Sequence, residues 1–466
     1  MDVDVAVLGG GPGGYSAAIR AAQLGAKVVC IEKDATLGGT CLNVGCIPTK
    51  AWVQTAHALK DAEETFAKLG VRVGEATLDF AASNTWKAGV VAGLTSGVAG
   101  LLKANGVEWV KGRGMFTGPT TIQVEGGESV TFKSAIVATG AFPARPPIEG
   151  LDSPRCLDST GLLAQTEVPK RLVILGGGII GCEFASIFSR FGSEVTIVEL
   201  LPRLIPAEDD DAATELAKQF KKRGIALHLG KQCTKVVDTG SELVVHFGEG
   251  ETVSTDLMLV AVGRVPLVEG LGLEAAGVTF DRRQGIATDE QRRTNVPGIF
   301  AVGDVAGHWQ LAHTAFREGE VAAENATGHH ATIDPRVAVP RPIYTDPEIA
   351  GVGLTEAQAR EEYGTDNVAV GVFPLLANAR AAMMNETIGW VKSIHETKYG
   401  ELLGLVMVGP HVTDLIEVGV VALDAEATVE TIADGIAPHP TLAEAIKEAG
   451  LVALGRPIHL PPKRKK

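Results

Sequence analysis

The chain carries one glycine pattern twice, and this repeat constrains its fold more than any other feature. In the first copy, the apolar run Val5–Leu8 leads to Gly9, Gly11 and Gly14, and a helix and a second strand follow, ending at Glu32. In dinucleotide-binding units the first glycine makes the turn, the second admits the pyrophosphate and the third lets helix and strand pack closely. The pattern therefore predicts a nucleotide site near the N-terminus of the chain.

The second copy repeats these offsets 167 residues further on. The run Val173–Leu175 leads to Gly176, Gly178 and Gly181, and the following strand ends at Glu199. A single G-x-G-x-x-G is weak evidence, but two copies, each with an acid 18 residues after the third glycine, are strong. Phosphate would lie at the helix N-terminus, and the acid would accept hydrogen bonds from a ribose. We expect two dinucleotide sites rather than two tight turns without a ligand.

Other apolar runs end at glycine, as strands of a parallel sheet buried on both faces do. They span residues 135–140, 258–263 and 299–304, and proline-rich stretches lie at 142–147 and 335–342. The last third has no glycine fingerprint, and its expected strands are 368–373, 389–394 and 402–408. With 466 residues and roughly 100 to 200 residues per domain, the length allows about three or four domains. We expect four, in the α/β class.

The charge balance and the apolar pattern exclude some partners. There are 42 Lys and Arg against 56 Asp and Glu, a net charge of −14, whereas nucleic-acid backbones are bound by Lys and Arg. The longest uncharged apolar stretch, 88–102, is shorter than the ~20 residues of a membrane span. The N-terminus lacks the features of a signal peptide. We expect a cytoplasmic protein that binds neither nucleic acid nor membrane, and we assign no role to the basic residues 463–466.

Two of the six cysteines form a close pair. Cys41 and Cys46 are five positions apart within Gly38–Lys50, which suggests redox chemistry or metal binding. Zinc is a poor alternative because no second Cys or His pair lies nearby, so we expect no metal site. The other cysteines are expected to be small hydrophobic residues, and they are Cys30, Cys156, Cys182 and Cys233.

The spacing of the pair demands a bend in the chain. On one ideal helix, positions i and i+5 rise by ~7.5 Å, whereas a disulfide needs Cα atoms within ~7 Å. Asn43 and Gly45 allow a bend that would bring the sulfurs together. Pro48 suits the first turn of a helix that restarts after the bend. Cys46 would then lie near a helix N-terminus, where the dipole favours a thiolate.

Two dinucleotide sites and a close cysteine pair together resemble the pyridine nucleotide-disulfide oxidoreductases. The resemblance extends over residues 3–454, and its most specific segments are 38–50, 176–183, 301–304, 311–313, 409–411 and 439–444. It implies two Rossmann-like domains, one for FAD at 1–145 and one for NAD at 146–270. It also implies a central domain at 271–340 that completes the FAD site, and a C-terminal α+β dimerisation domain at 341–466.

In this family the first fingerprint binds FAD and the second binds the nicotinamide nucleotide. The resemblance assigns FAD binding to Gly9, Gly11, Gly14, Glu32, Lys50, Thr139, Gly140, Asp304, Leu311, Ala312 and His313. It assigns NAD binding to Gly176, Gly178, Gly181, Glu183, Glu199 and Gly263. A carboxylate such as Glu199 accepts from the 2′-hydroxyl of NAD but repels the 2′-phosphate of NADP, and the nearby Arg203 is expected to be solvated. We therefore expect NAD.

The resemblance also assigns catalytic residues. Cys46 would face the flavin as a thiolate and Cys41 would exchange with the substrate, so that the pair forms a redox-active disulfide. Lys50 would lie beside flavin N5, paired with Glu183. The alternative for this pair is a surface salt bridge worth ~0 to 1 kcal/mol.

A base completes the expected site, because a thiol attacks as its thiolate. The resemblance assigns this role to His439, oriented by Glu444. The residues from Thr441 to Glu444 also match a capping box for a helix expected at 442–449. Glu444 could orient His439 and cap the helix at the same time.

The implied enzyme oxidises protein-bound dihydrolipoyl groups and reduces NAD. One expected partner is a second copy of the chain, since two-fold dimers are the commonest symmetric oligomers. The other is a lipoyl-bearing acyltransferase of a 2-oxo acid dehydrogenase complex, or the lipoyl carrier protein of glycine cleavage. The alternatives are an NADPH-dependent glutathione-type reductase, which Glu199 opposes, and a mercuric reductase, which would need a C-terminal cysteine pair. A non-catalytic flavoprotein scaffold should lack a thiol or the base.

Overall fold

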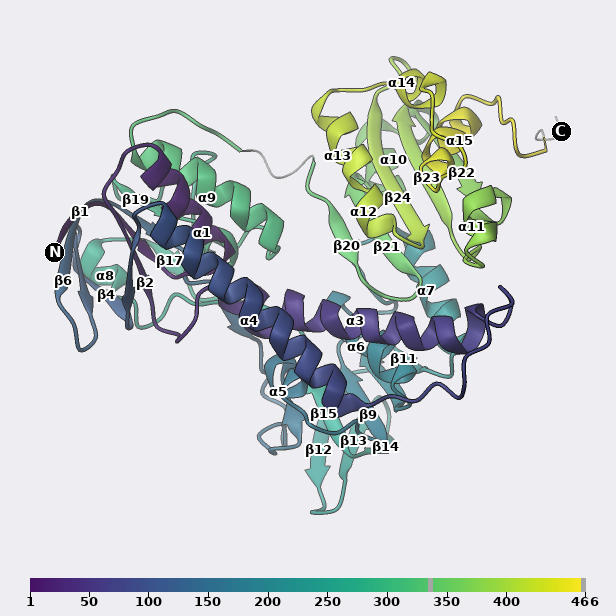
Figure 1. The fold of residues 1–466 in the computed structure, drawn as a ribbon, viewed down its shortest axis with the longest axis horizontal. Coiled ribbons are helices and arrows are strands. Elements are labelled where there is room, and N and C mark those ends of the chain that lie inside the picture. Colours follow the sequence, from purple (N-terminus) through teal and green to yellow (C-terminus); the bar gives the residue numbers. More distant parts are fainter. Residues whose placement is uncertain (334–337, 462–466) are drawn as a thin grey trace.

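The computed structural model describes residues 1–333 and 338–461, so residues 335–337 of the second proline-rich stretch and the basic residues 463–466 lie outside the described part. Figure 1 shows the N-terminal sheet at the left and the C-terminal sheet at the upper right. Between them run two long helices, α3 (Cys46–Lys60) and α4 (Phe80–Ala104). A third region lies below these helices and contains the middle of the chain.

The first sheet carries the first glycine loop. Its strands, in spatial order, are β3 (Glu108–Lys111), β2 (Val28–Glu32), β1 (Asp2–Leu8), β6 (Ser129–Val137), β5 (Thr121–Val124) and β4 (Gly114–Gly118), and β19 (Ile299–Ala301) pairs with β6. The strands β3, β2, β1, β6 and β19 pair in parallel, while β4 and β5 extend the sheet in antiparallel fashion. Two helices, α1 (Pro12–Gln23) and α9 (Ala312–Ala326), pack against each other beside it.

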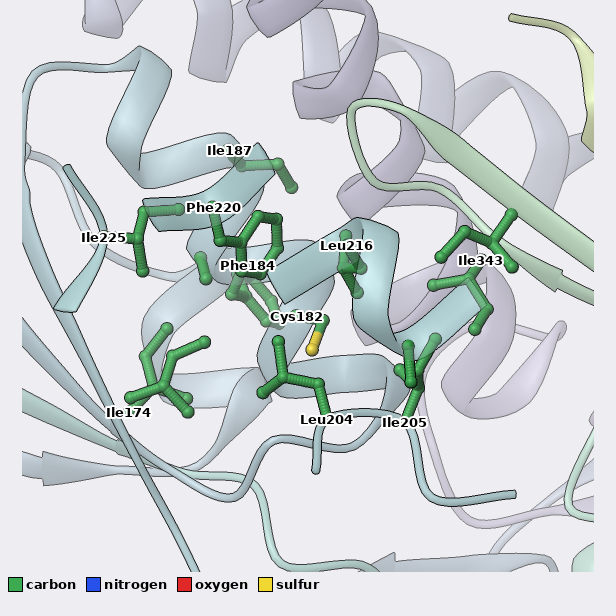
Figure 2. Close-up of a cluster of buried hydrophobic side chains, with 14 of the residues drawn as sticks. Ile174, Cys182, Phe184, Ile187, Leu204, Ile205, Leu216, Phe220, Ile225 and Ile343 are labelled. Carbon is green, nitrogen blue, oxygen red and sulfur yellow. The ribbon is translucent and has the colours of Figure 1, made fainter. Parts of the chain in front are cut away.

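The second sheet carries the second glycine loop and is parallel throughout. Its strands, in spatial order, are β11 (Ala226–Leu229), β10 (Glu194–Glu199), β9 (Arg171–Leu175), β15 (Leu257–Val260) and β8 (Cys156–Leu157). The helices of this region are α5 (Ser159–Leu163), α6 (Ile179–Arg190) and α7 (Asp210–Lys222). Figure 2 shows Phe184, Leu216 and Phe220 of these helices in one apolar cluster with Ile174 of the sheet, and Ile343 from the C-terminal region belongs to the same cluster.

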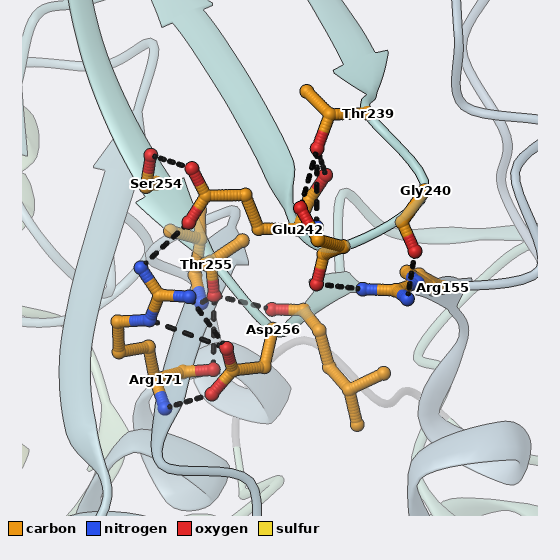
Figure 3. A network of polar contacts seen from close by, with 11 residues as sticks. Arg155, Arg171, Thr239, Gly240, Glu242, Ser254, Thr255 and Asp256 are labelled. Atoms are coloured by element: carbon orange, nitrogen blue, oxygen red, sulfur yellow. Dashed lines mark hydrogen bonds and ion pairs between the residues drawn. The ribbon is translucent and has the colours of Figure 1, made fainter.

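A small antiparallel sheet is attached to the second sheet by a polar network. Its strands are β12 (Cys233–Asp238), β13 (Leu243–Phe247) and β14 (Glu251–Thr255). The Arg171 guanidinium at the start of β9 pairs with Asp256 at 2.6 Å and Glu242 at 2.9 Å, and the Thr255 hydroxyl accepts from the Val173 N–H at 3.1 Å (Figure 3). These contacts fix the end of β9 that lies opposite the glycine loop.

The C-terminal region is a five-stranded antiparallel sheet covered by short helices. Its strands, in spatial order, are β20 (Arg341–Ile343), β21 (Glu348–Gly353), β24 (Leu402–Gly409), β23 (Trp390–Glu396) and β22 (Val368–Pro374). Its helices are α10 (Glu356–Tyr363), α11 (Ala379–Met383), α12 (Val412–Leu415), α13 (Glu417–Asp424), α14 (Val429–Asp434) and α15 (Glu444–Ala453). The three strands expected from the sequence are present as β22, β23 and β24. The helix expected at 442–449 begins two residues later.

Short elements connect these regions. They are α2 (Gly39–Val44), α8 (Leu273–Ala276), and the pairs β7 (Ala141–Pro143) with β16 (Arg264–Pro266) and β17 (Phe280–Asp281) with β18 (Gly285–Ile286). The predicted α/β class, with two Rossmann-like sheets and a C-terminal α+β domain, is confirmed. Within the described residues, no helix is both long and apolar enough to cross a membrane.

Candidate active site

Both glycine loops leave the first turn of a helix open to an anion. The helix α1 begins after Gly11 and α6 after Gly178, and these capping residues share nearly the same backbone angles, φ −74° with ψ −173° and φ −74° with ψ −174°. Neither cap has a side chain that accepts from the first-turn N–H groups. These groups carry the positive end of the helix dipole, so each loop can hold a pyrophosphate.

The remaining glycines of each loop are required by close backbone approaches. Gly9 and Gly176 have φ values of 107° and 109°, a region that glycine adopts without steric cost. A Cβ atom on Gly14 would collide with the carbonyl oxygen of Gly9, and one on Gly181 with that of Gly176. A Cβ atom on Gly178 would meet nothing within 4 Å. Open space thus lies where a pyrophosphate would approach the second loop. At the first loop, a Cβ atom on Gly11 would touch the Gly39 Cα at 3.7 Å, and the glycine keeps this approach free for a dinucleotide.

Each loop is also held by the acid that ends its second strand. Glu32 accepts from the Gly10 N–H at 2.7 Å, and Glu199 accepts from the Gly177 N–H at 2.5 Å. Both carboxylates are buried. Each acid therefore stays at the rim of its loop, where an adenosine ribose would bind.

The arginine near the second loop is engaged elsewhere. Arg203 was expected to be solvated, but it pairs with Asp210 and donates to the Pro206 carbonyl at 2.6 Å. The Glu199 carboxylate therefore sets the charge at this ribose position. That charge favours NAD over NADP.

The redox pair lies where two helices meet. The helix α2 ends at Val44 and α3 begins at Cys46, so Gly45 alone separates them, with φ −142° and ψ −110°. A Cβ atom on Gly45 would press against the Thr40 carbonyl oxygen, which explains the glycine. The break brings Cys41 and Cys46 together, and both are free thiols in the structure.

The pKa values of the two thiols are shifted in opposite directions. A hydrogen bond from Cys41 lowers the pKa of Cys46 to about 7, with help from the Lys50 charge and against the effects of burial and of Glu183. The hydrogen bond to Cys46, together with burial, raises the pKa of Cys41 well above its usual range. In the dithiol form, Cys46 is therefore the thiol that ionises first, while Cys41 keeps its proton.

An ion pair stands beside the dithiol. The Lys50 Nζ lies 2.9 Å and 2.8 Å from the two carboxylate oxygens of Glu183, and the Glu183 side chain is only 5% exposed. Burial disfavours the charged lysine, but the Glu183 carboxylate and Cys46 together raise its pKa. The Lys50 side chain is 30% exposed, so the pair is a partly buried feature of the site rather than a surface salt bridge.

Three further residues expected at the cofactors lie at strand ends. The Thr139 hydroxyl donates to the Leu267 carbonyl at 2.9 Å. Gly140 and Gly263 have φ values of 74° and 115°, and a Cβ atom on either would meet nothing within 4 Å. These glycines leave room for a ligand beside the connection between the first two sheets.

The start of α9 offers backbone donors, as expected. Leu311 caps the helix, which runs on from Ala312, and no side chain accepts from its first N–H groups. The His313 ring is engaged with the Pro340 carbonyl at 2.8 Å. This segment can therefore contact a flavin through main-chain N–H groups, where reduction places negative charge.

The turn that bears Asp304 depends on two residues that sequence reasoning missed. Arg264 lies 3.5 Å from the Asp304 carboxylate, and burial raises the pKa of Asp304. Glu318, which is fully buried, accepts from the Gly303 N–H at 2.6 Å. A charged residue directly after Gly263 was the available signal for Arg264, whereas an acid within a helix gave none for Glu318.

His439 and Glu444 form their expected pair. The His439 Nδ1 lies 2.9 Å from Glu444 Oε1, and Glu444 Oε2 accepts from the Thr441 N–H at 2.8 Å. The Thr441 hydroxyl donates to Pro438 instead of capping the helix, so only half of the capping box forms. Among the described residues, no contact joins His439 to either redox cysteine, and α15 lies far from the start of α3 (Figure 1).

Comparison with known proteins agrees with this geometry. Residues 3–319 match the pyridine nucleotide-disulphide oxidoreductases, and residues 339–450 match the dimerisation domain of the same group. The chain belongs to the pyridine nucleotide-disulphide oxidoreductase family. Its relatives in this family include the dihydrolipoyl dehydrogenase of Geobacillus stearothermophilus, with 43% identity over 99% of this chain and 98% of that one. The dihydrolipoyl dehydrogenase of Thermus scotoductus is 44% identical, over 98% of each chain.

Solved structures lead to the same family. The HOCl-induced flavoprotein disulfide reductase RclA from Escherichia coli has a TM-score of 0.87 and 30% identity, covering 96% of this chain and 99% of that one. LpdA from Mycobacterium tuberculosis has a TM-score of 0.88 and 30% identity, covering 96% and 98% of the two chains. As a pyridine nucleotide-disulphide oxidoreductase, the chain is an enzyme that uses FAD and NAD. It carries the dimerisation domain of this family at its C-terminal end.

Proposed function

We propose that this enzyme is a dihydrolipoyl dehydrogenase, which oxidises protein-bound dihydrolipoyl groups and reduces NAD. The observation that carries the proposal is the Cys41 and Cys46 pair, with its unequal pKa values, beside the Lys50 and Glu183 ion pair. The names and full-length coverage of the relatives at 43% and 44% identity support it. The Glu199 carboxylate at the second loop supports NAD as the acceptor.

The dithiol exchange can be written for this chain's own residues. A substrate thiolate attacks the Cys41 sulfur of the Cys41–Cys46 disulfide, and Cys46 leaves as a thiolate. The second substrate thiolate then attacks the substrate sulfur of this mixed disulfide, closing the lipoyl disulfide, and Cys41 leaves and takes a proton. His439, oriented by Glu444, takes the proton of the first attacking thiol and gives it to Cys41 as Cys41 leaves, while the proton of the second substrate thiol passes to solvent.

Bound FAD supplies the two-electron relay between the dithiol and NAD. On the FAD side we propose Gly9, Gly11, Gly14, Glu32, Thr139, Gly140, Asp304 and the N–H groups at 311–313 as its contacts. Lys50, held by Glu183, keeps positive charge next to the Cys46 thiolate. We propose the loop from Gly176 to Gly181, with Glu199 and Gly263, as the NAD site.

We also propose that the active enzyme is a homodimer whose sites are shared. His439 is 73% exposed and does not contact the redox cysteines of its own chain among the described residues, and the chain carries the family's dimerisation domain at 339–450. The base of one chain would then serve the dithiol of the other. The region 341–466 is the dimerisation domain in this proposal, beside an FAD domain at 1–145, an NAD domain at 146–270 and a central domain at 271–340.

A mixed dimer tests the shared site. A Cys46→Ser chain and a His439→Ala chain, each nearly inactive alone, are refolded together. Shared sites restore one intact pairing in each mixed dimer, so activity returns. If mixed dimers are demonstrated and remain inactive, His439 acts within its own chain.

The physiological electron donor would be a lipoyl group carried on another protein in the cytoplasm, either an acyltransferase or the carrier of glycine cleavage. The net charge of −14 suits a basic docking surface on that partner.

The direct test of the function is whether the purified yellow enzyme reduces NAD with dihydrolipoamide. An enzyme that ignores dihydrolipoamide but oxidises NADPH with glutathione disulfide would contradict the proposal.

A further inference from the structure

Tyr344 of the C-terminal region touches both members of the ion pair beside the dithiol. It directly follows β20, and its ring lies below the Lys50 Nζ, 4.6 Å from that atom to the ring centroid. Its backbone N–H donates to Glu183 Oε1 at 3.0 Å, the same oxygen that accepts from Lys50 at 2.9 Å. More than 130 residues separate each neighbouring pair of these three positions along the chain.

We infer that Tyr344 is a positioning residue of the redox site, whose ring holds the Lys50 ammonium in place so that its charge acts on Cys46. This inference rests on the proposed role of Cys46 as the thiolate beside the flavin. It connects the C-terminal region to the dithiol within one chain, in addition to any contribution that this region makes to a partner chain.

The physical reason lies in the charges that surround Cys46. Cys41 faces it from α2, Lys50 from its own helix α3 and Glu183 from α6. Lys50 favours the Cys46 thiolate and Glu183 opposes it, so the net effect depends on where the ammonium sits between them. An aromatic ring attracts a cation that lies over its face, and the Tyr344 ring therefore gives Lys50 a fixed third neighbour.

The Tyr344 ring packs at the edge of the apolar cluster, but other residues of its segment also anchor the C-terminal region. Ile343 is fully buried in the apolar cluster of Figure 2. Asp346 pairs with Lys60 at 2.8 Å and with Arg190 at 3.0 Å. These neighbours anchor the segment on both sides of Tyr344, so its side chain can be changed while the backbone N–H still reaches Glu183.

The test uses the FAD-loaded Cys41→Ser enzyme, in which Cys46 is the only thiol of the pair. The long-wavelength absorbance that a thiolate produces beside oxidised flavin is titrated against pH in this parent, in Tyr344→Leu and in Tyr344→Phe. Without a ring, Lys50 moves away and the thiolate is less stabilised, so the midpoint rises. We expect Tyr344→Leu to raise it by roughly 0.5 to 1 pH unit, a threefold to tenfold change in the acid dissociation constant. Tyr344→Phe keeps the ring and should leave the midpoint unchanged.

The outcomes separate this inference from the proposed function. If the parent shows the band and Tyr344→Leu titrates with the same midpoint, the positioning role is wrong while the Cys46 assignment stands. If the parent shows no band, the Cys46 assignment fails and the inference fails with it. Should Tyr344→Leu not retain FAD, Tyr344→Met takes its place with the same expected shift, and an unchanged midpoint there overturns the inference equally.

Discussion

The two glycine loops of this enzyme have nearly the same structure, yet the helices that follow them make different contacts. The helices α1 and α6 both contain 12 residues and start after glycine caps with almost identical angles. In each loop a buried glutamate accepts from the second glycine of the run, Gly10 or Gly177. The shared geometry is what any dinucleotide requires, and it therefore says nothing about which chemistry follows.

The difference appears at one equivalent position. Ser16 in α1 donates to the Pro12 carbonyl of its own helix at 2.6 Å. Glu183 lies 167 residues later, at the same offset, and reaches Lys50 on a different domain. The chain after Glu32 likewise enters the dithiol segment, whereas the chain after Glu199 enters the loop that leads to α7. In our proposal, both repeats therefore bind a nucleotide, and the catalytic residues lie where the repeats diverge.

The largest effect should come from replacing one glycine of each loop with alanine, so that a side chain disturbs the nucleotide cradle. Gly14→Ala places a Cβ atom against the Gly9 carbonyl, so we expect enzyme purified largely without flavin and without activity. Gly181→Ala should keep its flavin and raise the KM for NAD by roughly tenfold or more, because only the second helix is displaced. Flavin content and steady-state kinetics measure both effects. Gly97→Ala in α4, where a Cβ atom meets nothing within 4 Å, is the control. Equal flavin loss in both loop variants would contradict the division between the repeats.

The next largest effect should come from replacing the two redox cysteines, which follow only the first glycine repeat. Cys41→Ser and Cys46→Ser should each lower dihydrolipoamide-dependent NAD reduction by roughly a thousandfold or more, since the disulfide is lost. Cys41→Ser should retain long-wavelength absorbance from the Cys46 thiolate, and Cys46→Ser should not. In Cys41→Ser the Lys50 charge still favours the Cys46 thiolate, so the absorbance should fade as the pH falls through the pKa of the Cys46 thiol. The reverse pattern in the two variants would exchange the roles of the cysteines.

Cofactor choice should depend on the acid of the second repeat. Glu199→Ala removes a charge that repels a 2′-phosphate, and adding an arginine at Leu200 supplies an attractive one. We expect the ratio of kcat/KM for NAD to that for NADP to fall by roughly tenfold to a hundredfold. Arg203 is paired with Asp210 and does not substitute for the added arginine. A wild-type enzyme that uses both nucleotides equally would contradict this explanation.

The smallest effect should distinguish the two equivalent helix positions. Glu183→Gln keeps the shape of the side chain but removes the charge that holds Lys50, and we expect kcat to fall by roughly tenfold. Ser16→Ala removes a hydrogen bond within one helix and should change kcat by less than about twofold. Comparable losses in both variants would mean that the divergence at this position is not functional.

The sequence alone was sufficient for the repeated parts of the molecule. The regular spacing of the glycines predicted both loops, because local backbone geometry requires glycine at these positions. Gly45 indicated the break between α2 and α3 for the same reason. Three of the five strands of the C-terminal sheet, β22, β23 and β24, followed from their Val-rich runs, whereas β20 and β21 were not expected. Helix α15 starts at Glu444 because Thr441 bonds Pro438 rather than capping the helix, and this competition between acceptors has no sequence signature.

Apart from the Lys50–Glu183 pair, which the family resemblance implied, the contacts between distant segments were beyond such reasoning. Tyr344 meets Lys50 and Glu183 only after three separate regions have packed, and Glu318 supports the Asp304 turn from within a helix. Long-range packing decides all of these positions, and no local periodicity encodes it.

The most direct test of the division between the two repeats is to separate the half-reactions. Wild-type and Gly181→Ala holoenzymes are mixed anaerobically with dihydrolipoamide in the absence of NAD, and in a second experiment with NADH alone, while the flavin spectrum is followed. Electrons should enter through the first repeat and leave through the second. We therefore expect dihydrolipoamide to reduce both enzymes at similar rates and NADH to reduce only the wild type efficiently. Loss of the dihydrolipoamide reaction in Gly181→Ala, or its absence in the wild type, would contradict this division.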